Sequence, residues 1–219
     1  MAEEQDTNEV GGKLTPVEGI KESSRGLYGS LLSEIGDANA YLSEPSTQLI
    51  KHHGSYQQDD RDTRTARKKK GLDWDYKFMV RTKFPGGAIS AEQYLVCDGL
   101  CGKYGQDDLR VTSRQDFQFH GVVKGNLRPL VHDLNVLGEM TSFGGCGDVV
   151  RNTMAAPVAD IDRRYAKCSA NLLDIARRIS DHFMPKTKSY YDLWVDDEKV
   201  VVHDDGTYEI GKTSDAVDD

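Results

Sequence analysis

The chain has 219 residues, of which 37% are hydrophobic and 29% are charged. This length suffices for one good-sized domain or two small ones. The net charge of −8 argues against a protein that coats nucleic acid or an anionic membrane, and no apolar stretch approaches the length of a membrane span. The acidic N-terminus lacks the basic start and apolar core of a signal peptide, so we expect a cytoplasmic protein.

The first fifty residues are rich in Glu, Asp, Gly and Ser and contain Pro16 and Pro45. A segment of this composition has little apolar surface to bury when it folds. We therefore predict a flexible arm over residues 1–50, with one short helix near Leu27–Ile35.

Residues 51–71 are polar and dense in charge, without a clear apolar period. The basic run Arg64–Lys70 is either a solvated loop or helix end, or a contact for an anion or a nucleic acid. Because Asp59, Asp60 and Asp62 precede the run, the charge pattern favours the solvated interpretation.

A compact pattern begins at Tyr76. Residues 76–84 are rich in β-forming residues and partly alternate, which predicts a strand. After a Pro-Gly-Gly turn, Ser90 and Gln93 have the spacing of a capping box, which predicts the start of a helix. The apolar residues expected on its buried face are Tyr94, Leu95, Cys97, Leu100 and Cys101.

Two short strands are predicted next, over Leu109–Thr112 and Asp116–His120. Leucines then recur at spacings of three and four, which predicts another helix, at Leu127, Leu130, Leu134 and Leu137. The resulting β-α-β-β-α order is typical of a ferredoxin-like α+β sheet.

The remainder of the chain is predicted as a glycine-rich loop over 140–159, a helix over 161–183 and a hairpin. The helix has a continuous apolar stripe that includes Ile175, Ile179 and Phe183. The hairpin joins Tyr190–Val195 to Lys199–Val202, and an acidic, turn-rich tail follows it.

Four cysteines are present, and Cys97 and Cys101 form a C-x3-C pair. A complete metal site usually needs four ligands, and no histidine pair has zinc-finger spacing. Because both cysteines lie in a predicted helix, the sequence favours a structural role for the pair, and we assign no metal ligands.

Several cations occupy positions where folding does not require them. They interrupt an apolar strand, flank strand ends or follow a glycine-rich loop, at Arg81, Arg110, Arg114, His120 and Arg151. Each one alone is explained by an edge charge or a surface ion pair. Together they are planar donors on strand ends and loops, and the four arginines are permanently charged, which suits the binding of several carboxylates or an oxyanion. Hydrolase and nucleotide-binding signatures are missing from the sequence.

Five strings of the sequence resemble the haemoprotein component of assimilatory sulfite reductase, a member of the sirohaem-dependent sulfite and nitrite reductases. They occur in the family's order and at similar spacings, as HHGSYQQDDRD (52–62), FMVRTKFPGG (78–87), LRVTSRQDFQFHGVVKGN (109–126), CGDVVRN (146–152) and YYDLWVDDEKV (190–200). The resemblance implies six-electron reduction of sulfite to sulfide at sirohaem, which is coupled to a [4Fe–4S] cluster. It implies a flavoprotein subunit or ferredoxin as electron donor, and neither nucleic acid nor membrane as partner.

The same resemblance implies roles for individual residues. Arg81 and Arg151 match the family's arginines that bind sulfite oxygens and help to supply protons. The residues matching those that hold sirohaem are Arg110, Arg114, Gln118, His120 and Asn152. A polyanionic macrocycle needs fixed guanidinium groups, which agrees with the cation pattern.

The resemblance also implies a domain division. We expect an arm over 1–50, a ferredoxin-like half-domain over 51–140, and a truncated start of the sirohaem and cluster domain over 141–219. The family's cluster ligands, a C-x5-C and a C-x3-C, would follow downstream, so the expected product is a fragment that is inactive alone. Three alternatives remain open, which are a sirohaem nitrite reductase, a non-catalytic sirohaem-binding module, and a nucleic-acid binder that uses Arg64–Lys70.

Overall fold

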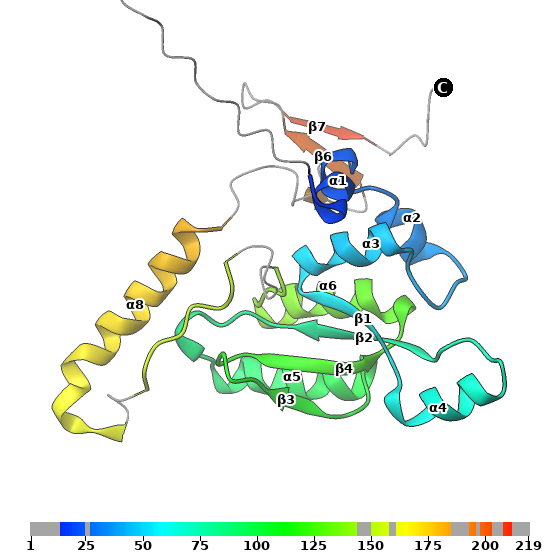
Figure 1. Ribbon diagram of the computed structural model, residues 1–219. Coiled ribbons are helices and arrows are strands. Elements are labelled where there is room, and N and C mark those ends of the chain that lie inside the picture. Colours follow the sequence, from blue (N-terminus) through cyan, green and yellow to red (C-terminus); the bar gives the residue numbers. More distant parts are fainter. Residues whose placement is uncertain are drawn as a thin grey trace, which may run out of the picture. The chain divides into compact units, whose positions relative to one another are not determined.

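The computed structural model describes residues 14–24, 27–143, 150–157 and 161–184, together with strands at 193–195, 198–202 and 208–211 (Figure 1). Residues 1–184 and 185–219 form two compact units.

A four-stranded antiparallel sheet organises the first unit. Its strands are β1 (Ser55–Asp59), β2 (Tyr76–Arg81), β3 (Leu109–Val111) and β4 (Phe117–Val122), in the spatial order β1-β2-β4-β3. The predicted β-α-β-β-α order is confirmed for β2 onward. The edge strand β1 falls in the segment that we interpreted as polar and without a period, because its sequence SYQQD offers almost no apolar alternation.

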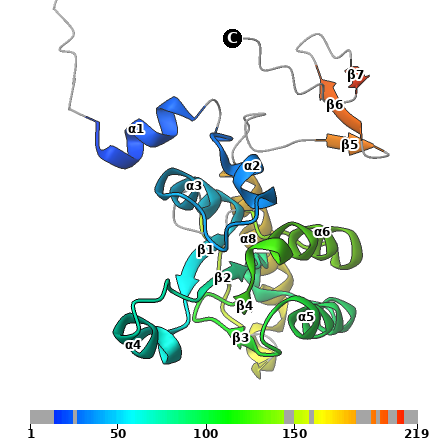
Figure 2. The same cartoon turned by 90° about the vertical axis from the view of Figure 1, so that its right-hand side faces the viewer.

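Two helices, α5 (Ala91–Tyr104) and α6 (Leu127–Gly138), lie on one side of strands β2 and β4 (Figure 2). The predicted capping box is present, since Ser90 Oγ accepts from the Gln93 amide and Gln93 Oε1 accepts from the Ser90 amide, both at 3.1 Å. The predicted buried face of α5 is correct for its C-terminal half only. Tyr94 and Leu95 are exposed.

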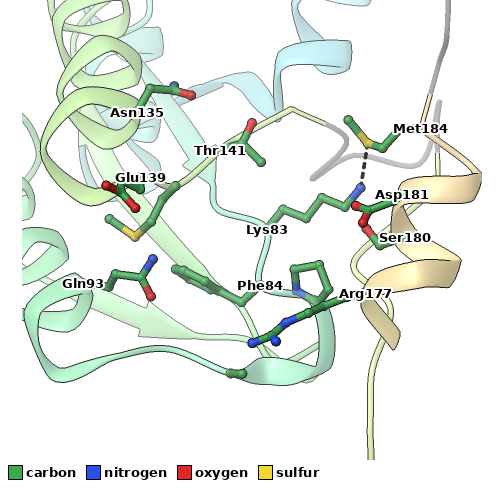
Figure 3. A pocket seen from close by; sticks show the side chains of 13 residues that line it. Lys83, Phe84, Gln93, Asn135, Glu139, Thr141, Arg177, Ser180, Asp181 and Met184 are labelled. Carbon is green, nitrogen blue, oxygen red and sulfur yellow. Dashed lines mark hydrogen bonds between the residues drawn. The ribbon is translucent and has the colours of Figure 1, made fainter. Parts of the chain in front are cut away.

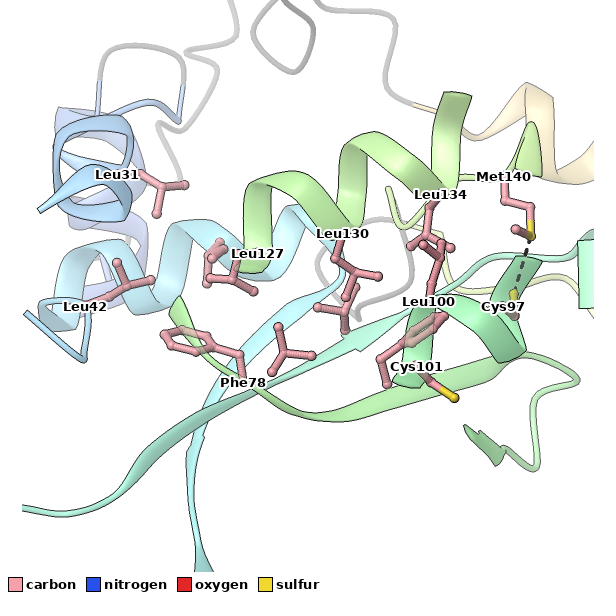
Figure 4. Close-up of a cluster of buried hydrophobic side chains, with 14 of the residues drawn as sticks. Leu31, Leu42, Phe78, Cys97, Leu100, Cys101, Leu127, Leu130, Leu134 and Met140 are labelled. Atoms are coloured by element: carbon pink, nitrogen blue, oxygen red, sulfur yellow. Dashed lines mark hydrogen bonds between the residues drawn. The ribbon is translucent and has the colours of Figure 1, made fainter. Parts of the chain in front are cut away.

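The core lies between the sheet and these two helices. Phe78 projects into it from β2, and Leu130 and Leu134 from α6 (Figure 4). Phe119 and Val122 of β4 belong to the same cluster, and all five side chains are 0% exposed. Side chains alternate between the two faces along a regular strand, so Gln118 and His120, which flank Phe119, point to the opposite face of the sheet.

Both cysteines of α5 are buried in this core as free thiols. Cys97 Sγ lies 3.6 Å from Met140 Sδ, and Cys101 Sγ donates to the Asp98 carbonyl. Burial raises the pKa of the Cys97 thiol to about 12, so this thiol is neutral at physiological pH.

The N-terminal segment contributes helices to the core. It contains α1 (Pro16–Ser23), α2 (Leu31–Gly36), α3 (Glu44–Leu49) and the 3₁₀ turn η1 (Ile50–His53). Leu31, Leu42, Leu49 and Ile50 are buried in the same hydrophobic cluster. The prediction of one short helix near Leu27–Ile35 therefore underestimates the helical structure, because the three helices are short, α1 has no buried residue, and α2 and α3 each bury a single large side chain.

The basic run forms most of helix α4 (Arg61–Lys69), which Asp60 caps. No residue of this helix is buried, and Arg64 donates to both oxygens of Asp59 at 2.5 and 2.6 Å. The cations in its last turn, Arg67, Lys68 and Lys69, lie next to the negative end of the helix dipole and stabilise the helix there. Their presence therefore does not require a bound anion or nucleic acid.

The described part of the first unit contains four further elements. They are the turns η2 (Pro85–Gly87), η3 (Lys124–Asn126) and η4 (Arg163–Tyr165), and the long helix α8 (Ala166–His182). Helix α8 packs on η2, where Leu173 and Ala176 lie against Gly86. The apolar stripe predicted for this helix does not face that contact.

Ile175, Ile179 and Phe183 of that stripe are 47%, 41% and 61% exposed, whereas Ala176 and Ser180 are buried. The small residues allow the helix backbone to approach η2 closely. Among the helices that the structure describes, none has the length and apolar character needed to cross a bilayer.

The second unit contains an antiparallel sheet of β5 (Leu193–Val195), β6 (Glu198–Val202) and β7 (Tyr208–Gly211). The predicted hairpin corresponds to β5 and β6. Strand β7 lies in the tail that we expected to be turn-rich.

Candidate functional site

Three of the predicted site residues form a row across neighbouring strands. Arg81 on β2 lies opposite Gln118 on β4, and Gln118 lies opposite Arg110 on β3. Directly opposed residues share a face of the sheet, and their neighbours Val80 and Phe119 fill the core. The row therefore lies on the face away from α5 and α6, which we call the site face and define by Tyr56, Arg81, Arg110, Gln118 and His120.

Gln118 joins its neighbours through its side-chain amide. In the orientation that satisfies both of them, its oxygen accepts from Arg81 Nε at 3.0 Å and from Arg81 Nη2 at 3.2 Å, and its nitrogen donates to His120 Nε2 at 3.0 Å. This orientation fixes one edge of the Arg81 guanidinium group. The guanidinium group of Arg81 makes no other hydrogen bond with the residues that the structure describes, so its other N–H donors can bind a ligand.

Tyr56 on β1 contacts the flat face of the same arginine. The guanidinium carbon of Arg81 lies 5.3 Å from the centre of the Tyr56 ring, which is a cation–π contact. Arg81 is thus held by an amide along one edge and by a ring against its plane. Such restraint lowers the entropy that the side chain loses when it binds an anion.

His120 accepts the Gln118 hydrogen bond at Nε2, so its neutral form has its proton on Nδ1. Burial lowers the pKa of His120, and the positive charges of Arg110 and Arg81 lower it further. The neutral imidazole is therefore favoured near pH 7, with an Nδ1–H group available as a donor.

Arg110 is more exposed than Arg81, with 53% of its side chain accessible. Its Nε and Nη2 atoms both lie 3.2 Å from Asp108 Oδ2. An ion pair this exposed contributes little to stability, so the guanidinium group is free to exchange Asp108 for another carboxylate.

Arg114 and Asn152 form a second group at the turn between β3 and β4. Arg114 Nη2 donates to the Asn152 carbonyl at 3.1 Å, and Asn152 Nδ2 donates to the carbonyls of Arg114 at 2.8 Å and Gln115 at 3.2 Å. Asn152 is 1% exposed. Its amide nitrogen is thus occupied by the main chain. Arg114 Nε and Asn152 Oδ1 are buried without a hydrogen-bond partner among the described residues.

Arg151 is exposed and lies next to Asn152 in the chain. Residues 144–149, which include most of the string CGDVVRN, lie outside the described residues. The structure therefore brings Arg81, Gln118, His120 and Arg110 together on one face. It fixes the main chain beside Arg151 through Asn152.

Three residues near the site were not predicted from the sequence. Tyr56 lies in the unpredicted strand β1, and Gln115 and Asp116 lie beside Arg114. Burial raises the pKa of the Asp116 carboxyl, although a hydrogen bond with the Thr112 hydroxyl and the charges of Arg81 and Arg114 lower it. The sequence contains one indication of Gln115 and Asp116, because these two polar residues directly follow Arg114, a predicted site residue.

A cavity of about 550 Å³ lies between η2, the end of α6 and α8 (Figure 3). Lys83 and Arg177 line it together with Glu139 and Asp181, so its charges are of both signs. Lys83 Nζ donates to Met184 Sδ at 3.0 Å. None of the predicted site residues lines this cavity. Among the described residues, no cluster of three or more His, Cys, Asp or Glu side chains could hold a metal ion.

Comparison with known proteins identifies the half-domain. Residues 73–137 match the family described as "Nitrite/Sulfite reductase ferredoxin-like half domain". The chain is 44% identical over 193 residues to the "Sulfite reductase [NADPH] hemoprotein beta-component" of Myxococcus xanthus, which covers 88% of this chain and 34% of that protein. This chain is a homologue of the N-terminal part of such haemoproteins.

Other relatives give the same result. Proteins of the same description from Oceanobacillus iheyensis and Xanthomonas euvesicatoria are 39% and 43% identical, covering 87% and 84% of this chain. The chain spans about a third of the length of these relatives. A solved structure titled "Structure of Mycobacterium tuberculosis NirA protein" shares the fold, with a TM-score of 0.54 at 21% identity, over 68% of this chain and 28% of that chain.

Proposed function

We propose that this chain provides part of the substrate and cofactor site of a sirohaem-dependent sulfite reductase. The strongest support is the row Arg81–Gln118–Arg110 with His120, on a sheet whose relatives are named as sulfite reductase haemoproteins. Fixed guanidinium donors on one face suit a ligand that presents several carboxylates, as sirohaem does.

The residues present fit this cofactor. Arg114 has a buried Nε–H group with no acceptor among the described residues, and a buried donor without an acceptor is unfavourable. A carboxylate at this position would satisfy it. Asn152 fits less directly, because its amide nitrogen already donates to two carbonyls, so we assign it to holding Arg114 and Arg151 in place.

When bound, sirohaem coupled to a [4Fe–4S] cluster would supply the electrons for the six-electron reduction of sulfite to sulfide. The role of this chain is electrostatic. Arg81 and Arg151 would bind sulfite oxygens and stabilise the charge that develops as these oxygens leave as water. Arg110, Arg114 and the Nδ1–H group of His120 would hold cofactor carboxylates, and Gln118 orients Arg81 and His120.

The remaining parts of the site are proposed to come from other residues. We expect the cluster ligands in the part of the relatives that this chain does not match. The relatives are described as NADPH enzymes, which favours an NADPH-linked flavoprotein over ferredoxin as the electron donor.

A chimaera tests the proposal. The matched residues of this chain would replace those of the M. xanthus haemoprotein, and sulfite reduction would be measured with a reduced dye as electron donor. We expect turnover. The variant Arg81→Gln should retain sirohaem but lose about 100-fold in kcat/KM, since hydrogen bonds between charged groups contribute about 2–3 kcal/mol.

The matched control is Arg64→Gln on α4, which removes an equal charge from a surface ion pair and should leave kcat/KM unchanged. A chimaera that binds sirohaem but does not reduce sulfite would contradict the proposal. So would equal losses in the Arg81 and Arg64 variants.

Nitrite is the second candidate substrate, because the matching half-domain is described for nitrite and sulfite reductases alike. Turnover of both anions by the same chimaera distinguishes them. A chimaera that binds sirohaem and reduces neither anion would instead favour the non-catalytic binding module.

A further inference from the structure

The segment 150–157, which we call the strap, is attached to two turns at the end of the sheet. Its attachments to the β3–β4 turn come from Asn152 and from Gln115. Its attachment to η2 is a hydrogen bond from the Gly86 amide to the Thr153 carbonyl at 2.7 Å. The strap has no helix or strand of its own, so these bonds determine its position.

Gln115 makes two of these bonds with a single strap residue. Its Nε2 donates to the Ala155 carbonyl at 2.7 Å, and its Oε1 accepts from the Ala155 amide at 3.0 Å. The side chain thereby pairs with the main chain of the strap as an adjacent strand would.

The backbone of Gln115 is constrained in a way that fits this function. Its φ angle is +59°, a left-handed conformation that is uncommon for a residue with a side chain. Gly87 lies directly against it, because a Cβ atom at Gly87 would be 2.8 Å from Gln115 Cβ. Strained residues of this kind persist where the surrounding structure holds them and are frequent at functional sites.

Arg151 precedes Asn152 in the strap, and Arg114 precedes Gln115 in the turn. The bonds of Gln115 and Asn152 therefore fix the positions from which two predicted anion-binding arginines project. We infer that Gln115 is a positioning residue, which sets Arg151 relative to Arg114 so that Arg151 reaches sulfite while Arg114 holds a cofactor carboxylate. This inference rests on the proposed function.

The test uses Gln115→Gly, because glycine accepts the positive φ and removes only the side-chain bonds. The control is Gln58→Gly on the exposed part of β1. The first measurement is hydrogen exchange at the Ala155 amide in this chain. We expect at least about 10-fold faster exchange in Gln115→Gly, since the protecting acceptor is removed, and no change in Gln58→Gly.

The second measurement is a double-mutant cycle on the KM for sulfite in the chimaera. If Gln115 acts through Arg151, then Gln115→Gly should raise KM by about 5–10-fold, and by far less when Arg151→Ala is already present. Additive effects would overturn the inference, as would unchanged exchange at Ala155. If Arg151→Ala alone has no effect, the proposed role of Arg151 is refuted. The exchange rate of the Ala155 amide still shows whether the hydrogen bonds between Gln115 and Ala155 hold the strap.

Discussion

The contact between Gly87 and Gln115 predicts opposite effects for two glycine-to-alanine substitutions. Gly87 has a φ angle of +69°, and its added Cβ atom would lie 2.8 Å from Gln115 Cβ, too close for two non-bonded carbon atoms. Alanine in the left-handed region costs about 1–2 kcal/mol, and displacing Gln115 adds to this, so Gly87→Ala should lower the free energy of unfolding by about 2–3 kcal/mol.

Gly99 provides the matched comparison. It lies inside α5, and an added Cβ atom there would meet nothing within 4 Å. Gly99→Ala should therefore raise the free energy of unfolding by about 0.5–1 kcal/mol, because alanine is the better helix former. Urea unfolding followed by the helical circular-dichroism signal measures both values. Equal stability of Gly87→Ala and the unmodified chain would refute the close packing on which the position of Gln115 depends.

Further predictions concern stability, pH and thiol chemistry. Leu49 is 1% exposed and Leu32 is 64% exposed. In urea unfolding, Leu49→Ala should therefore destabilise the chain by about 2–5 kcal/mol, and Leu32→Ala by less than about 0.5 kcal/mol. Equal effects would show that α3 does not belong to the core. Because burial and Arg110 lower the pKa of His120, the folded chain binds fewer protons there than the unfolded chain, so stability should fall as pH falls below the ordinary value of 6.5. In an NMR titration, Arg110→Gln should raise the pKa of His120, and a fall would contradict the assigned cause. Cys97, whose thiol pKa is about 12, should react with iodoacetamide only after the chain unfolds, and rapid labelling of the folded chain, detected by mass spectrometry, would argue against its burial.

The sequence predicted the elements whose patterns are local. The capping box at Ser90, the leucine spacing of α6 and the β-rich run of β2 each identify an element without reference to the rest of the chain. By contrast, β1 is a polar edge strand that is stabilised by pairing with β2, and α1 to α3 are too short to show a clear period. Tertiary contacts, which no local pattern encodes, order both regions.

For the candidate site, too, the sequence predicted the local features but not those that depend on tertiary contacts. The cations were recognisable in the sequence, and the resemblance supplied their roles. Their alignment in a row depends on the register of three strands, and the bridging amide of Gln118 depends on that register too. Tyr56 and Gln115 could not be selected in advance, because their contacts join segments that are far apart in the sequence.

The apolar stripe on α8 shows that a helix can be predicted without its buried face being predicted correctly. Periodicity identified the helix, but not which face would be covered. The described contacts bury Ala176 and Ser180, since small side chains let α8 approach η2, and leave Ile179 and Phe183 exposed.

Under the proposed function, the cations around the β2–β4–β3 row hold the carboxylates of sirohaem. The most direct test is the sirohaem content of the purified chimaera, measured by absorption after expression with sirohaem synthesis. Two triple variants are compared. The first removes the proposed cofactor ligands, by Arg110→Gln, Arg114→Gln and His120→Gln. The second is the control and removes exposed cations at the end of α4, by Lys68→Gln, Lys69→Gln and Lys70→Gln. We expect the first variant to lose most of its sirohaem and the second to retain it. Full sirohaem content in the first variant would contradict the role of these cations in binding the cofactor.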